Sequence, residues 1–100
     1  MPGSPVILFT PGHTLGHCAL HLPERDVIIS GDALVTYDPY TVTRGPRIVA
    51  RGATADSERA LASLERLAGT GVGTLLPCHG EPWTGGAERA VQEARCVGVL

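Results

Sequence analysis

The amino-acid sequence predicts an α/β (α+β) fold in a single domain that spans residues 1–100. Three observations support this prediction. Short apolar runs of β-forming residues occur in both halves of the chain, two of them flank a polar turn, and two later segments repeat apolar residues at helical spacing. The chain is 43% hydrophobic, which is enough for one small core. The expected order is a strand, a β-hairpin, a long loop, a helix, a strand and a helix.

The first third of the chain predicts a strand followed by the hairpin. Residues 5–10 (PVILFT) form an apolar run that ends at a Pro-Gly turn signal. Residues 17–22 (HCALHL) and 27–32 (VIISGD) flank the polar segment 23–26 (PERD). Two β-rich runs around a short polar turn are typical of antiparallel strands.

The second half predicts two helices and one further strand. Residues 54–69 (TADSERALASLERLAG) carry acids in the first turn and end on glycine, and Thr54 or Asp56 can cap this helix. Residues 72–80 (VGTLLPCHG) predict a buried strand that ends in a turn, and residues 85–96 predict the second helix. The residues expected to face inward are Leu61, Leu64, Leu67 and Ala68 in the first helix and Ala87, Ala90, Val91 and Ala94 in the second.

Composition argues against several functional classes. The net charge is -2, and the eight basic residues are all arginines scattered along the chain, unlike a nucleic-acid-binding face. The three cysteines show no C-x-x-C spacing, so no disulfide framework is expected. No apolar run approaches the ~18 residues of a membrane span. We therefore expect a cytoplasmic protein without nucleic-acid or membrane partners.

Three of the four histidines lie within residues 9–32, a stretch that ends on a carboxylate. In the simplest register of the hairpin, His17 lies opposite Asp32, where side chains are neighbours. His13 sits four residues earlier, just after the turn that ends the first strand. Local geometry can therefore bring two histidines and an aspartate to one end of the sheet.

A further histidine can reach the same edge from the second half. His79 follows a buried strand directly, and sites concentrate where strands end in turns. Histidine and aspartate together suit Zn²⁺, which lowers the pKa of bound water toward ~7. A ligating histidine needs a partner on its second ring nitrogen, and Thr10, Thr14 and His17 are near enough to supply one. The alternative for each histidine is an ordinary hydrogen-bonded residue at a strand end, and His21 is expected to be of this kind.

Three motifs resemble those of the C-terminal half of the metallo-β-lactamase superfamily. TPGHTLGH resembles the family's third metal-binding motif, SGDALV its fourth and LLPCHGEPW its fifth. The motifs occur in the family's order and span nearly the whole chain. The resemblance implies a single partial domain that forms half of an αββα sandwich. In that half, a mixed sheet containing the hairpin carries two helices packed on one face.

The resemblance also implies roles for individual residues. His13, Asp32 and His79 match the family's zinc ligands, with Asp32 bridging two ions and orienting the attacking hydroxide. His17 and Thr14 are then expected to support these ligands rather than to bind metal. A different possibility, independent of the resemblance, is a structural zinc site that uses Cys18 or Cys78.

The chain departs from the family pattern because it contains no HxHxDH motif. That motif belongs to the first half of the family's sandwich, and without it each metal position lacks two ligands. Two functions therefore stay open. One is a truncated metal-dependent hydrolase that uses zinc-activated water on an ester, thioester, lactam, lactone or phosphodiester. The other is a non-catalytic half-domain that forms a homodimer, or pairs with a missing N-terminal half, through an exposed sheet face.

Residues 33–54, which are rich in Gly, Pro and Arg, predict a long loop. Ile48 and Val49 are its candidates for a short strand. In a hydrolase this loop would line the substrate cleft, with Tyr37 and Tyr40 as contacts. The alternative is a solvated connection.

Overall fold

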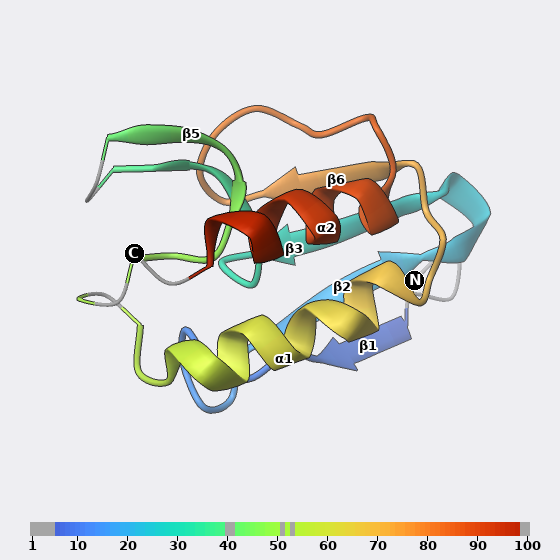
Figure 1. The fold of residues 1–100 in the computed structure, drawn as a ribbon. Coiled ribbons are helices and arrows are strands. Elements are labelled where there is room, and N and C mark those ends of the chain that lie inside the picture. Colours follow the sequence, from blue (N-terminus) through green and yellow to red (C-terminus); the bar gives the residue numbers. More distant parts are fainter. Residues whose placement is uncertain (1–5, 40–41, 51, 53, 99–100) are drawn as a thin grey trace.

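The computed structural model describes residues 6–39, 42–50, 52 and 54–98. Within them, two helices lie on one face of a twisted sheet, and a separate two-stranded ribbon lies at one end of that sheet (Figure 1). The elements in chain order are β1 (Val6–Phe9), β2 (Cys18–Leu22), the 3-10 turn η1 (Pro23–Arg25), β3 (Val27–Gly31), β4 (Val35–Asp38), β5 (Thr43–Arg47), α1 (Ser57–Ala68), β6 (Thr74–Pro77) and α2 (Ala87–Val97).

The larger sheet is mixed, as the sequence predicted. Its strand order is β1-β2-β3-β6. β2 pairs antiparallel with both β1 and β3, whereas β6 runs parallel to β3. Since parallel strands cannot be joined by a tight turn, the chain crosses over between them through the ribbon and α1. This crossover makes the carboxyl ends of β3 and β6 neighbours.

The hairpin forms in the predicted register near its turn. Leu22 pairs with Val27 and Leu20 with Ile29, and η1 closes the hairpin. Beyond Ile29, the pairing of β3 with β6 shifts at an irregularity before Gly31. The ladder between β2 and β3 itself ends at Leu20 and Ile29, short of the site residues.

The prediction of a long loop over residues 33–54 is wrong for much of that segment. β4 and β5 form an antiparallel ribbon in this segment. Gly45 and Pro46, which favoured a loop, lie where the register of the ribbon shifts. A bulge in an isolated ribbon tolerates both residue types. Ile48 and Val49 follow β5 outside any strand and are buried.

The helices begin and pack much as their patterns predicted. The side chain of Asp56 caps α1 by accepting a hydrogen bond from the backbone N–H of Arg59 at 3.0 Å. Thr54, the other candidate cap, instead donates from its hydroxyl to the carbonyl of Val49 at 2.8 Å. The buried helix residues are Ala60, Ser63, Leu64 and Leu67 in α1 and Ala87, Ala90, Val91 and Ala94 in α2, with Leu61 and Ala68 packed at the edge of the core.

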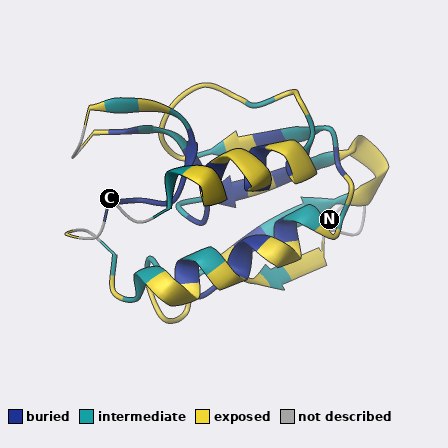
Figure 2. Cartoon of the chain, in the orientation of Figure 1, coloured by how far each residue is buried: buried dark blue, intermediate teal, exposed yellow. Residues whose placement is uncertain are grey.

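The core lies between the helices and one face of the sheet, to which Ala19, Ile28 and Leu75 contribute. Figure 2 shows burial concentrated between these layers and exposed residues along β1 and on the outer sides of both helices. None of the helices in the described ranges is long and apolar enough to cross a membrane.

The opposite face of the sheet carries an exposed apolar row. Ile7, Leu20, Ile29 and Leu76 are consecutive cross-strand partners on β1, β2, β3 and β6. Ile7 is 68% exposed, Ile29 41% and Leu76 37%, and Leu20 is half-buried. We refer to these four residues as the outer row.

Candidate functional site

Three side chains from separate parts of the chain meet beyond the carboxyl ends of β3 and β6. The Nε2 atom of His13 lies 3.5 Å from Oδ2 of Asp32. The Nε2 atom of His79 lies 3.5 Å from the other carboxylate oxygen, Oδ1. The Asp32 carboxylate therefore stands between two imidazoles and turns a different oxygen to each.

The parallel pairing of β3 and β6 explains how Asp32 and His79 come together. Gly31 pairs with Pro77 at the ends of these strands, so the residues that follow leave the sheet side by side. Ligand sites of parallel sheets form at this edge for the same reason. The N–H of Cys78 donates to the carbonyl of Gly31 at 3.1 Å, which continues the contact between the two strand ends.

The turn that carries His13 is fastened to the start of α1. The carbonyl of Gly12 accepts a hydrogen bond from the N–H of Asp56 at 2.9 Å, and that of His13 accepts one from Ala55 at 3.1 Å. The hydroxyl of the buried Ser63 also donates to the carbonyl of Pro11 at 2.6 Å. These hydrogen bonds to α1 therefore fix the position of His13 relative to the end of the sheet.

The turn that carries His79 is held by the ribbon, through a residue that sequence reasoning missed. The N–H of Thr36 in β4 donates to the carbonyl of His79 at 3.2 Å, and its hydroxyl donates to that of Glu81 at 2.6 Å. Since the segment was expected to be a loop, nothing in the sequence marked Thr36 as a partner of this turn.

His17 is hydrogen-bonded through both ring nitrogens. Its Nδ1 lies 2.9 Å from the hydroxyl of Thr10, and its Nε2 accepts a hydrogen bond from the backbone N–H of Asp32 at 3.2 Å. Burial, the main cause, lowers the pKa of His17 below its ordinary range; Asp32 opposes this shift, His13 adds to it, and the hydrogen bond with Thr10 opposes it.

The lowered pKa of His17 makes stability depend on pH. Below the ordinary pKa of 6.5, the unfolded chain binds a proton that the folded chain resists, so the contribution of His17 is complete above that pH and declines as the pH falls. We expect wild type to lose more unfolding free energy than His17→Gln between about pH 7.5 and about pH 5.5 in urea titrations. An equal or larger loss in the variant would contradict this assignment.

Thr14 and His21, which were also considered from the sequence, make no contact with the Asp32 carboxylate among the described residues. Thr14 is exposed, and its carbonyl accepts hydrogen bonds from the N–H groups of Gly12 and His17 at 3.0 and 3.4 Å. His21 lies near the turn of the hairpin, paired with Val6 and Ile28.

Tyr37 follows Thr36 on β4, and the guanidinium of Arg44 lies 5.3 Å from the centre of its ring. This pair therefore stands beside the turn that carries His79, which Thr36 holds. Tyr40 lies outside the described residues.

The donor atoms fit a metal in pairs. Two ligand atoms that are each ~2.0–2.1 Å from a tetrahedral zinc lie ~3.3–3.4 Å apart, close to the 3.5 Å of both histidine–aspartate pairs. Nδ1 of His13 and Oδ1 of Asp32 are buried and have no hydrogen-bond partner among the described residues. Within those residues, no three His, Cys, Asp or Glu side chains are grouped to hold a single ion. The two histidines face opposite carboxylate oxygens, so the donor atoms form two separate pairs rather than one triad.

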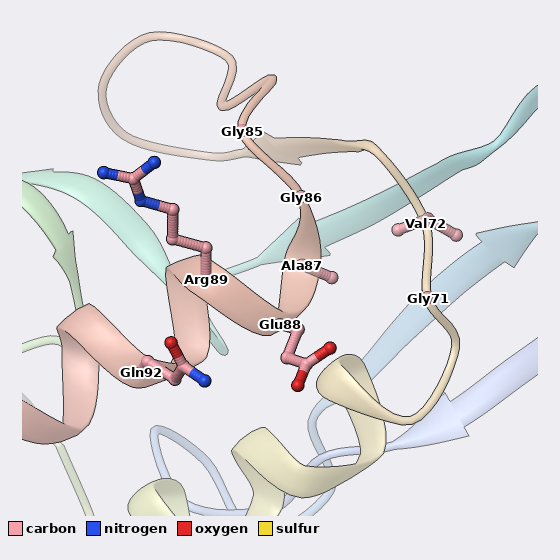
Figure 3. Close-up of a pocket in the computed structure, with 8 residues that line it drawn as sticks. All are labelled: Gly71, Val72, Gly85, Gly86, Ala87, Glu88, Arg89 and Gln92. Atoms are coloured by element: carbon pink, nitrogen blue, oxygen red, sulfur yellow. The ribbon is translucent and has the colours of Figure 1, made fainter.

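A pocket of about 400 Å³ lies elsewhere, at the N-terminal end of α2 (Figure 3). Its walls combine glycine backbone with the side chains of Glu88, Arg89 and Gln92. None of the residues around Asp32 lines it, so this pocket is separate from the candidate site.

The fold agrees with comparisons to known proteins. The chain belongs to the metallo-β-lactamase superfamily, whose family model matches residues 2–79. This confirms the family resemblance of the sequence motifs. A curated relative, the probable metallo-hydrolase YflN of Bacillus subtilis (strain 168), is 35% identical over 85 residues, which cover 76% of this chain and 31% of the relative.

Solved structures of the same superfamily share the fold. The family protein TTHA1429 from Thermus thermophilus is 27% identical with a TM-score of 0.63, and the match covers 93% of this chain and 32% of that protein. The archaeal family protein ST1585 from Sulfolobus tokodaii is 17% identical with a TM-score of 0.65, covering 89% of this chain and 31% of that one. The chain thus spans about a third of the length of these relatives, as expected for a half-domain.

Proposed function

We propose that this chain supplies the metal-bridging part of a zinc-dependent hydrolase. The observation that supports the proposal most strongly is the placement of Asp32, whose two carboxylate oxygens face His13 and His79 separately at 3.5 Å. A carboxylate can bridge two ions by directing one oxygen to each, with a further ligand beside each oxygen. Bound zinc would supply a water molecule of lowered pKa at neutral pH.

The chain's own residues would hold and orient the reacting groups. Asp32 would fix the spacing of the two metal positions, while His13 and His79 would each hold one of them. The substrate class proposed from the family is an ester, thioester, lactam, lactone or phosphodiester. Tyr37 and Arg44, which stack on one another beside the turn of His79, are the proposed contacts for the substrate.

Among the described residues, each proposed metal position would have two ligands, whereas catalytic zinc usually has three protein ligands. We therefore propose that full activity requires ligands from another polypeptide segment. The chain alone would bind zinc weakly, through the histidine–aspartate pairs.

Zinc binding to the purified chain tests the proposal. We expect Asp32→Asn to weaken zinc affinity at least about tenfold, and His13→Ala and His79→Ala to weaken it by similar factors, because each removes a ligand or the bridge. Competition with a chromophoric chelator measures these affinities. His21→Ala is the matched control and should leave the affinity unchanged. Zinc binding that is absent, or equally strong in all four variants, would contradict the proposed function.

The outer row supports a second proposal, a non-catalytic half-domain that pairs through its sheet. Four apolar side chains in register across all four strands form the kind of contiguous exposed surface that marks an interface. We propose that the isolated chain forms a homodimer through this face, and that another sheet could occupy it in a larger assembly.

The oligomeric state of the chain tests this second proposal. We expect sedimentation equilibrium to show a dimer and Ile29→Glu to shift it to a monomer, since the change buries a charge at the centre of the interface. Leu15→Glu is the matched control, because Leu15 is also exposed and apolar but lies outside the sheet. A monomeric, folded wild-type chain would exclude the homodimer.

A further inference from the structure

We propose that His17 is a positioning residue: its neutral imidazole, with the proton on Nδ1, fixes the backbone of Asp32 so that the two carboxylate oxygens face different histidines. Only the role of the positioned carboxylate, which is to bridge metal ions, rests on the proposed function. The arrangement itself follows from hydrogen bonds within the chain.

The direction of each hydrogen bond determines the tautomer of His17. A backbone N–H can only donate, so Nε2 must present a lone pair to the N–H of Asp32 at 3.2 Å. In a neutral imidazole the other nitrogen then carries the proton. Nδ1 therefore donates to the hydroxyl of Thr10 at 2.9 Å, and this hydroxyl lies 3.5 Å from the carbonyl of His17, to which it donates.

Thr10 is a firm anchor for the ring. It is only 2% exposed, and its backbone N–H donates to the carbonyl of His17 at 2.9 Å. Thr10 follows β1 directly, whereas Asp32 follows β3. The imidazole thus connects the ends of two strands that are not neighbours in the sheet, which backbone pairing cannot do.

Gly31 makes room for this connection. Its φ of +57° is a left-handed conformation, and a side chain there would bring Cβ to 3.0 Å from Nε2 of His17. Glycine at position 31 therefore lets the ring reach the next backbone N–H without a close contact to a side chain. On the other side, Cys78 holds the carbonyl of Gly31. The peptide between Gly31 and Asp32 is thus hydrogen-bonded at both of its polar groups, the carbonyl to Cys78 and the N–H to His17.

The position of the Asp32 backbone determines what its side chain can reach. Asp32 has no strand partner among the described residues, so the register of the sheet does not set its orientation. Its backbone N–H is held instead by the hydrogen bond to His17. Without this bond, the backbone of Asp32 could shift relative to the two histidines, and the contact of one carboxylate oxygen with each histidine, which restrains the side-chain rotamer, would be lost.

The test uses the full chain, free of metal and labelled with ¹⁵N and ¹³C, with two matched variants. His17→Gln places an amide oxygen near the position of Nε2 and keeps an acceptor for Asp32. His17→Asn places its amide near Nδ1 and keeps only the partner for Thr10. We expect wild type to show a scalar coupling across the hydrogen bond between the Asp32 amide nitrogen and Nε2, with the proton on Nδ1.

The variants separate positioning from mere packing. We expect hydrogen exchange of the Asp32 amide, relative to that of Leu75, to be about tenfold faster in His17→Asn, the factor given by loss of one hydrogen bond. In His17→Gln it should stay within about threefold of wild type. Three-bond couplings should show one Asp32 side-chain rotamer in wild type and His17→Gln, and an average of rotamers in His17→Asn.

Several outcomes would overturn the inference. They are absence of the cross-bond coupling in wild type, a proton on Nε2, or the same Asp32 rotamer in His17→Asn as in wild type. If His17→Asn does not fold, the wild-type coupling and the rotamer in His17→Gln decide the question. These measurements need no zinc, so a chain that binds no metal would remove the proposed function and leave the positioning role to be judged by the coupling and the rotamers.

Discussion

Gly12→Ala is expected to lower the free energy of unfolding by about 2–6 kcal/mol, the sum of ~1–3 for a strained backbone and ~1–3 for overpacking. Gly12 is buried and has a φ of +149°. A Cβ atom at this position would overlap the backbone and Cβ of Ala60 in α1. Neither group can move without moving the helix, so the clash cannot be relieved by a side-chain rotation.

The consequence of Gly12→Ala should extend to the site. The carbonyl of Gly12 accepts the N–H of Asp56, and that of His13 accepts the N–H of Ala55. Pushing this turn away from α1 therefore removes both attachments of the histidine turn. Denaturant titration measures the stability change. Gly16→Ala is the matched control, because nothing lies within 4 Å of a Cβ there. Equal stability of the two variants would contradict the close approach of Gly12 to α1.

Gly80→Ala is expected to destabilise the chain by about 1–3 kcal/mol more than Gly86→Ala does, because only the first change also produces a steric clash. The two glycines have nearly the same φ, +91° and +95°, so both changes introduce similar backbone strain. At Gly80, a Cβ would overlap the hydroxyl of Thr36 and lie 2.6 Å from the backbone nitrogen of Tyr37. At Gly86 nothing lies within 4 Å.

The clash at Gly80 should also release the turn of His79. The N–H of Thr36 donates to the carbonyl of His79, so we expect its hydrogen exchange to be about tenfold faster in Gly80→Ala, as for a lost hydrogen bond. Gly86→Ala should leave that exchange unchanged. A Thr36 amide that stays protected in Gly80→Ala would show that the ribbon does not hold this turn.

The sequence predicted best those elements whose structure depends on residues close together in the chain. The polar segment between two β-rich runs predicted the hairpin and its register near Leu22 and Val27, because a short turn determines which residues face one another. The buried faces of the two helices were also predicted, because the spacing of apolar residues within a single segment determines them. The meeting of His13, Asp32 and His79 followed from motifs at strand ends, although only the three-dimensional arrangement shows that the histidines take opposite oxygens of the carboxylate.

The ribbon could not be predicted for a physical reason. Glycine and proline ordinarily interrupt a strand, and nothing local distinguishes a bulge that accommodates Gly45 and Pro46 from a loop. The role of Thr36 depends on a turn more than 40 residues away in the chain. His17 was placed opposite Asp32 from the hairpin register, yet the regular ladder ends before them and the contact is made by a side chain.

The parallel pairing of β3 with β6 also bears on how the chain folds. The first three strands are consecutive, so they can assemble by closing short segments, whereas pairing β6 with β3 closes a segment that spans residues 32–73. Closing a longer segment costs more entropy and slows the search for the native contacts. We therefore expect a nascent chain to acquire the positions of His13 and Asp32 early and that of His79 last, so that this centre is assembled in the closing stage of folding.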